Sequence, residues 1–291
     1  MKIALVILTY NVQGKGQAGG SGPDALLSAG LVERLKASGH EIACVRRVQL
    51  TEAEEEQYGG WNRVGIAGRY LAGLVADANR EGAFVLGLLA DCNGVLGVIG
   101  GLQRGEKPNR PRRVGLVYVD AHGDYNTPDR SPSGMLGGMP VAVAAGKDLA
   151  RLRIQNEIHI PLQPPDILLA GMRDLDELER RALEQDGVEV LRERDLIEKS
   201  PALHDAMSYL AGREDVVYVH VDLDILDPSC APAAGLPSPQ GLTGVELGQA
   251  LRSMLAYPKV GALSFVSYRA DADRDGRTLR EVLDAIAGAL L

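Results

Sequence analysis

The stretch Val117–Pro140, which reads VYVDAHGDYNTPDRSPSGMLGGMP, decides the fold because it joins a strand to a polar cluster and then to a loop. The apolar run at residues 114–119 is typical of a buried strand. Asp120, His122 and Asp124 follow it at two-residue spacing, before a segment rich in Gly, Pro and Ser. Side chains two apart on extended backbone point the same way, so Asp124 joins the other two if the chain stays extended. Two carboxylates and an imidazole at a strand end predict a divalent metal site.

A second stretch, farther along the chain, repeats this pattern. The apolar run VVYVHV at residues 216–221 is followed by Asp222 and Asp224, again two residues apart. Aspartates also cap strands and form turns, but two such motifs, each closing an apolar run, favour a site. Four carboxylates gathered at two strand ends repel one another and are costly to bury without cations. A ligand set rich in oxygen, with one imidazole, favours Mn- or Mg-like ions over a cysteine-rich zinc site.

Length, charge and cysteine content restrict the class of protein. The 291 residues suit one α/β domain, so we expect residues 1–291 to form a single domain. A formal charge of -8 argues against nucleic acid and anionic membranes as partners, and no apolar run approaches the ~20 residues of a transmembrane helix. The three cysteines, Cys44, Cys92 and Cys230, are odd in number and far apart, which favours a reducing cytoplasm over a disulfide framework.

Strand and helix patterns alternate along the chain, which predicts a single-domain, three-layer α/β/α fold with a mostly parallel sheet. In such sheets, sites form beyond the carboxyl ends of the strands, where both aspartate motifs lie. Strands are expected over residues 2–9, 41–46, 83–89, 114–119, 166–170, 188–191, 216–221 and 259–266. Helices are expected over residues 23–38, 61–80, 94–102, 140–154, 175–186 and 200–212, and after the two Thr-x-x-Glu capping boxes at Thr243 and Thr278.

The segment Gly14–Gly19 matches the GxGxxG spacing of dinucleotide-binding loops, but its surroundings do not. Pro23 and other residues intervene before a helix can begin, and the next strand ends in Arg46 and Arg47 without an acidic residue for a ribose. We expect a mobile glycine-rich loop that borders the pocket.

Taken together, these motifs resemble the ureohydrolase superfamily, which includes arginases, agmatinases and formimidoylglutamases. The resemblance covers nearly the whole chain and implies an arginase-like fold, hydrolysis of a linear C–N bond in a guanidino or amidino compound, and a small-molecule substrate. It also implies a homo-oligomer, a trimer or hexamer. The segments that carry it are Asp120-Ala-His122-Gly-Asp124, Asn126, Ser133-Gly, Gly171-Met-Arg173-Asp174, Asp222-Leu-Asp224-Ile-Leu-Asp227-Pro228 and Gly276-Arg277-Thr278.

The resemblance implies two Mn ions bridged by a hydroxide that attacks the substrate carbon. Asp120 and Asp222 would bridge both ions. Asp124 would bind one ion, while His122 and Asp224 would bind the other. Asp124 and Asp224 are the expected catalytic residues, and Asp124 would hold the attacking water and carry its proton.

The resemblance also assigns substrate contacts. Asn126 and Ser133 match positions that contact an amino-acid carboxylate in arginases, and Asp176 matches a position near the α-amino group. Asn126 and Ser133 are also ordinary turn residues, which is the structural alternative.

Three positions depart from the family pattern. Cys92 stands where the family has its first histidine ligand; a thiolate is softer, which admits Fe, Co, Ni or Zn beside Mn. Alternatively, Cys92 is a buried free cysteine, with Asp91 or Asn93 as ligand. Gly137 stands in place of a proton-shuttling histidine, and loss of a positioned acid costs ~10²–10⁴-fold in rate. Ser267 stands at the position of the guanidinium-binding glutamate.

These departures predict a substrate other than L-arginine, because a serine cannot pair with a guanidinium. An N-hydroxyguanidine and a formimino compound are the candidates. Arg269 would meet either an anionic group or a surface partner such as Asp271, and the surface pair is favoured. The alternative function is a catalytically degenerate arginase-family protein that acts in binding or assembly. Five of the six expected ligand positions are kept, which favours the enzyme, and bound metal distinguishes the two.

Overall fold

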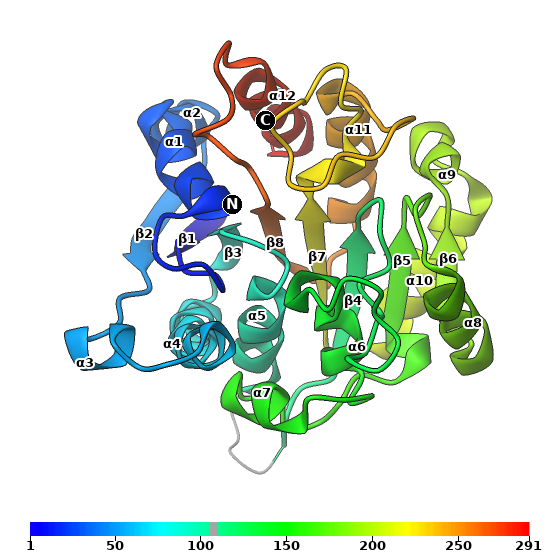
Figure 1. Ribbon diagram of the computed structural model, residues 1–291. Coiled ribbons are helices and arrows are strands. Elements are labelled where there is room, and N and C mark those ends of the chain that lie inside the picture. The colour runs from blue at the N-terminus through cyan, green and yellow to red at the C-terminus, as the bar shows by residue number, and fades with distance from the viewer. Residues whose placement is uncertain (105–109, 291) are drawn as a thin grey trace.

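The computed structural model describes residues 1–104 and 110–290, and its centre is an eight-stranded sheet (Figure 1). The strand order is β2-β1-β3-β8-β7-β4-β5-β6. Every pairing between these strands is parallel, so the predicted mostly parallel sheet is confirmed. The strands are β1 Lys2–Leu8, β2 Glu41–Arg47, β3 Phe84–Leu89, β4 Val114–Val119, β5 Ile167–Ala170, β6 Glu189–Leu191, β7 Val216–Asp222 and β8 Val260–Val266.

The central strands β4 and β7 lie in the interior of the protein. All residues of β4 and β7 are buried, as expected for parallel strands covered on both faces. The edge strands β2 and β6 keep exposed residues. The continuous apolar runs of the sequence thus form strands in the centre of the sheet, where both faces are covered.

Helices cover both faces of the sheet, which confirms the three-layer architecture (Figure 1). One face is covered by α4 Gly60–Arg80, α5 Gly94–Gln103, α6 Pro140–Ala144, α7 Ala150–Gln155 and α8 Glu177–Asp186. The other is covered by α1 Gly22–Ser28, α2 Leu31–Ala37, α9 Glu193–Glu198, α10 Pro201–Arg213, α11 Gly244–Leu255 and α12 Arg277–Leu290. Each face buries its own apolar cluster, which the sheet separates from the other. None of the described helices is long and apolar enough to cross a membrane.

Two helices expected as single elements are each two helices. The helix expected over residues 23–38 is broken at Gly30, whose φ of 79° lies in the left-handed region. The helix expected over residues 140–154 is interrupted before Leu149, which has a φ of 48°. Two short helices were not expected: α9 and α3 (Glu52–Glu55), the latter with its own capping box at Thr51.

One of the two expected capping boxes is present and the other is wrong. The Thr243 hydroxyl accepts from the Glu246 amide, and Glu246 accepts in return from Thr243. In contrast, Asp273 accepts from the amides of Thr278 and Leu279 at 3.2 and 2.8 Å, and α12 begins before Thr278. A carboxylate at a helix N-terminus is a stronger acceptor than a hydroxyl, so the upstream loop supplies the cap.

Candidate metal centre

Residues from four neighbouring strand ends line one cavity of about 520 Å³. Cys92 follows β3, Asp120 follows β4, Asp222 ends β7 and Ser267 follows β8. These strands are adjacent in the order β3-β8-β7-β4. Because all four are parallel, their carboxyl ends meet at the same edge of the sheet, and this edge carries the candidate site.

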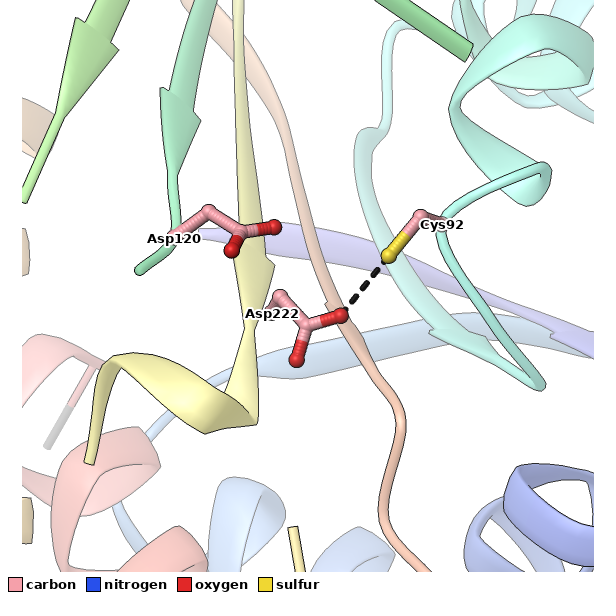
Figure 2. A group of neighbouring side chains, drawn as sticks. All are labelled: Cys92, Asp120 and Asp222. Carbon is pink, nitrogen blue, oxygen red and sulfur yellow. Dashed lines mark hydrogen bonds between the residues drawn. The ribbon is translucent and has the colours of Figure 1, made fainter. Parts of the chain in front are cut away.

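The first group of candidate ligands consists of Cys92, Asp120 and Asp222, whose side chains point toward one another (Figure 2). Their ligand atoms all lie within 4.8 Å of one another. The Cys92 thiol donates to Asp222 Oδ2 at 2.7 Å, and the Ser267 hydroxyl donates to the same oxygen at 2.6 Å. Asp222 is therefore the meeting point of the residues that follow β3 and β8.

The second group consists of Asp120, His122 and Asp224, again with ligand atoms within 4.8 Å of one another. His122 Nδ1 donates to Asp224 Oδ2 at 3.0 Å. Backbone amides fix the carboxylates: Asp120 accepts from His122, and Asp222 accepts from Asp224. Because Asp120 belongs to both groups, the arrangement is that of two adjacent cation sites that share a carboxylate.

Asp124 lines the same cavity, but not by the expected route. Its φ of 47° is left-handed, so the chain is not extended at this residue and the condition for strand alternation to bring Asp124 to the site is not met. The Asp124 carbonyl accepts from the amides of Val141 and Ala142, which begin α6, and its Oδ2 accepts from the Tyr118 phenol. The direction of this carboxylate is therefore set by a turn, which the α6 amides hold at its carbonyl and the Tyr118 phenol holds at its side chain, rather than by strand alternation.

The electrostatics of the groups fit divalent cations. Burial, and then the neighbouring Asp224, raise the pKa of Asp120 well above its usual value and that of Asp222 to about 7. Burial lowers the pKa of His122, but its hydrogen bonds with Asp120 and Asp224 outweigh this and raise it to about 12. Without cations the cluster holds protons to relieve its repulsion, and a set of buried carboxylates, one imidazole and one thiol suits two divalent ions.

Cys92 has the position of a ligand, whereas the alternatives beside it do not. Burial, and then the Asp222 carboxylate, raise the pKa of its thiol well above the usual value, so a metal ion must displace the thiol proton. Asp91 Oδ1 accepts from both the amide and the side chain of Asn93. Asp91 belongs to neither ligand group among the described residues, and Asn93 is not among the residues that line the cavity.

The expected substrate contacts lie along another wall of the cavity. The Asn126 side chain donates to Asp176 Oδ2 at 2.9 Å, and Asp176 immediately precedes α8. Ser133 is exposed, and its hydroxyl accepts from the Met135 amide. Gly137 also lines the cavity but presents no side chain. The structure brings Asn126, Ser133 and Asp176 to the cavity together with both ligand groups.

Three further residues shape the site, and none of them is assigned a role in it from the sequence. Tyr118 supplies the phenol that holds Asp124; it lies two residues before Asp120, so strand alternation signals it. Glu179 is buried in α8 and accepts from the Tyr125 amide at 2.8 Å. Arg173 donates to the Asp224 carbonyl at 2.7 Å and also to the carbonyls of Ser238 and Pro239. Contacts with backbone carbonyls leave no trace in sequence spacing.

Residue 171, the first of the segment Gly171-Met-Arg173-Asp174, must be a glycine because of its backbone conformation and its close neighbours. Its φ is 103°, and a Cβ there would lie 2.2 Å from the Ile225 side chain and 3.0 Å from the Asp120 carbonyl. The glycine therefore lets the chain after β5 pass close to the site.

His220 and the glycine-rich loop lie beside the ligand groups. His220 is buried, stacks on Tyr118 at 4.8 Å and shares hydrogen bonds with Tyr218 and Ser264, outside both ligand groups. The glycine-rich loop borders the cavity through Ala18 and Gly19.

Two charged residues next to the ligand segments have surface or loop partners. Asp227 accepts from the amides of Ser229 and Gly241, which fixes the loop after β7. Arg269 lies 3.9 Å from Asp271, which is the favoured surface pair, although Arg269 also lines the cavity.

Comparison with known proteins agrees with this geometry. The sequence model described as the Arginase family matches residues 2–291. The arginase of Bacillus caldovelox is 30% identical over 277 residues, which cover 92% of this chain and 91% of that protein. The arginase of Brevibacillus brevis is 31% identical over 267 residues, 89% of this chain and 87% of its own.

Solved structures show the same architecture. Arginase from Bacillus cereus superposes with a TM-score of 0.86 at 24% identity, over 100% of this chain and 98% of that chain. Formimidoylglutamase from Bacillus subtilis, at 15% identity, shares the fold with a TM-score of 0.74 over 99% of this chain and 86% of its own. The arginase-like fold is thereby confirmed. With a matching sequence model over nearly its whole length and curated relatives at 30% identity, the chain belongs to the arginase family.

Proposed function

We propose that this protein is a metal-dependent hydrolase of a guanidine- or amidine-type C–N bond, with a substrate other than L-arginine. The observation that carries the proposal is the pair of ligand groups that share Asp120, in a cavity that Ser267 also lines. By the family resemblance, Ser267 stands where a carboxylate is expected. The two groups support a hydrolytic metal centre, and Ser267 sets the choice of substrate.

The residues of the two groups would divide between two ions. Cys92, Asp120, Asp124 and Asp222 would hold one, and Asp120, His122, Asp222 and Asp224 the other. When bound, two divalent ions lower the pKa of a shared water and so supply a nucleophile at neutral pH. Mn is the expected metal, and the Cys92 thiol extends the choice to softer ions.

The chain's own residues would hold the water and the substrate. Asp124 keeps one carboxyl oxygen on the Tyr118 phenol, which leaves the other to accept from the attacking water and take its proton. Asp176, already bonded to Asn126, would accept from a substrate ammonium group. Ser133 would donate its hydroxyl to a substrate carboxylate.

Ser267 and Gly137 disfavour L-arginine as the substrate. The Ser267 hydroxyl is uncharged and already donates to Asp222, so it cannot pair with a guanidinium. Gly137 has no side chain that could protonate the leaving amine. A hydroxyl group on a guanidine withdraws electrons and lowers its basicity, so an N-hydroxyguanidine needs no carboxylate partner. A formimino compound likewise has a less basic C=N group than arginine.

A degenerate, non-catalytic role remains the alternative. Burying Asp120, Asp124, Asp222 and Asp224 together raises the pKa of three of them, which is a cost that a protein without metal has no reason to bear. The ligand groups therefore favour the enzyme. A cytoplasmic location and a trimeric or hexameric assembly stay predictions.

The test begins with metal content per chain, by mass spectrometry of protein purified without chelator. We expect about two divalent ions per chain, in line with binuclear hydrolytic sites, and hydrolysis of N-hydroxyguanidines or formimino compounds in preference to L-arginine. Cys92→His should shift the bound metal toward Mn. Asp205→Asn, at an exposed position on α10, is the matched control and should change neither the bound metal nor the substrate preference. The proposal would be refuted by a metal-loaded sample that releases no amine, ammonia, urea or formamide from a set of guanidines, N-hydroxyguanidines and formimino compounds.

A further inference from the structure

Four residues next to the candidate metal centre, here called the second subsite, are Gly235, Leu236, Ser267 and Arg269. All four line the cavity. The segment after β8 pairs with the loop that carries Gly235: the Arg269 amide donates to the Ala233 carbonyl at 3.0 Å, and an antiparallel bridge joins Tyr268 to that loop. The subsite is therefore held by backbone pairing.

The second subsite is lined by small residues and one apolar side chain. A Cβ on Gly235 would lie 3.0 Å from Ser267 Cβ, so these two residues pack closely and leave little side-chain volume in front of them. The Ser267 hydroxyl is already bonded to Asp222. Leu236 is 55% exposed and borders the cavity. The residues leave room for a short, partly apolar group next to the metal-ligand groups.

Arg269 gives the second subsite its charge. It is the only Lys or Arg that lines the cavity in the part of the chain the structure describes, whereas many carboxylates do so. Its Nη2 lies 3.9 Å from Asp271, and the two side chains are 45% and 55% exposed. A surface pair of this kind contributes little and exchanges readily. An arginine fork suits a carboxylate or another oxyanion.

The second subsite and the expected amino-acid contacts lie on opposite sides of the metal-ligand groups. Arg269 follows β8, Asp176 follows β5, and β7 and β4 lie between them in the sheet. Three strand spacings correspond to about 14 Å. Asp120 and Asp222 end the two strands in between, so a substrate held at both ends places its central carbon near them.

We propose that the second subsite binds an anionic substituent on the terminal nitrogen of the substrate guanidine. The substrate class is then a disubstituted guanidine, with an amino-acid side on one nitrogen and a short chain ending in a carboxylate or similar oxyanion on another, so that the substrate itself carries the negative charge that Ser267 does not offer its guanidinium. This inference rests on the proposed function. In the reaction, the oxygen of water adds to the guanidine carbon, and the bond from that carbon to the amino-acid-side nitrogen breaks. That nitrogen takes a proton and leaves as a primary amine, and the other product is a urea that keeps the anionic substituent.

The experiment compares two substrates of similar size, Nω-carboxymethyl-L-arginine and Nω-ethyl-L-arginine. Both release ornithine, which is quantified by chromatography with metal-loaded protein. We expect kcat/KM to be about tenfold or more higher for the carboxymethyl compound, as for a charge-assisted hydrogen bond. Arg269→Ala should bring the ratio close to one, and Arg269→Lys should keep part of it. Arg274→Ala, an exposed arginine of the following loop outside the cavity lining, is the matched control and should keep the full ratio.

A binding measurement separates this inference from the proposed function. Calorimetry with N-(carboxymethyl)urea, the second product, should show weaker binding to Arg269→Ala than to the wild type. Equal binding, equal kcat/KM for the two substrates, or a preference that survives in Arg269→Ala overturns the second subsite. If the wild type hydrolyses Nω-hydroxy-L-arginine in the same assay, the proposed function stands even then. If neither guanidines nor formimino compounds are hydrolysed, the proposed function fails, and the binding comparison alone decides the second subsite.

Discussion

The two sides of the cavity differ in how their residues are held. On the β4–β7 side, Asp120 and Asp222 each accept from an amide of their own short motif, those of His122 and Asp224. On the β3–β8 side, Cys92 and Ser267 share one oxygen of Asp222, although they lie far from each other in the chain. Local motifs thus build the β4–β7 side, while the β3–β8 side depends on which residues the fold happens to bring together. Replacements at Cys92 or Ser267 are therefore expected to act on the metal and the substrate through Asp222, while the amides that hold Asp120 and Asp222 stay in place.

The largest expected effect follows from Asp120→Asn, because this residue belongs to both ligand groups. We expect loss of at least one ion per chain and loss of measurable hydrolysis. The same change removes one carboxylate from a repelling buried set, so the metal-free variant should unfold at a higher temperature than the metal-free wild type. Metal analysis and thermal unfolding with and without Mn measure both effects. Full metal occupancy in the variant would contradict the assignment of Asp120 as the shared ligand.

A pH dependence of the metal-free protein should come next in size. The pKa of Asp222 rises from 3.8 to about 7 on folding, so its contribution favours the folded state fully below pH 4 and is lost as the pH rises through 7. Asp120 and Asp124 shift in the same direction. We expect the free energy of unfolding of the metal-free chain to fall by a few kcal/mol between pH 5 and 8. Denaturant unfolding with chelator measures it, and saturating Mn should remove or reverse the trend; a metal-free chain that gains stability over this range would contradict the charge repulsion.

Ser267→Glu tests whether the β3–β8 side sets the substrate preference. A carboxylate at this position would pair with a guanidinium, and such charged hydrogen bonds typically change binding by about 10–100-fold. We expect kcat/KM for L-arginine to rise by this order, while the preference for an N-hydroxyguanidine declines. Ser267 has a φ of 68°, so the replacement inherits the existing backbone strain. Ser267→Gln is the matched control of equal size; a similar gain in that variant would show that volume, rather than charge, sets the substrate.

The same two sides explain what could be predicted from the sequence. The strands of the β4–β7 side and their aspartates were found by residue spacing alone, because each apolar run and its motif are contiguous. Cys92 and Ser267 were located only through a resemblance to a family, since no local pattern connects them to Asp222. The cap of α12 was misassigned to Thr278 because Asp273 reaches it from a loop. Strand alternation could bring Asp124 to the site only on extended backbone, whereas its turn is set by amides of α6, which carry no side-chain signature.

The smallest expected effect concerns the support beneath the β4–β7 side. Tyr118→Phe removes the phenol that donates to Asp124 but keeps the ring that stacks on His220. Loss of such a supporting hydrogen bond typically costs about 10–100-fold, and we expect the lower end, in kcat rather than KM, with metal content unchanged. The phenol lowers the pKa of the Asp124 carboxyl, so without it the carboxyl keeps its proton to higher pH, and the acid limb of the pH–rate profile should move upward. Tyr209→Phe, at an exposed tyrosine of α10, is the matched control. An unchanged kcat and an unmoved acid limb in Tyr118→Phe would show that the turn at Asp124 alone directs its carboxylate, and that this side of the cavity needs no support beyond its own motifs.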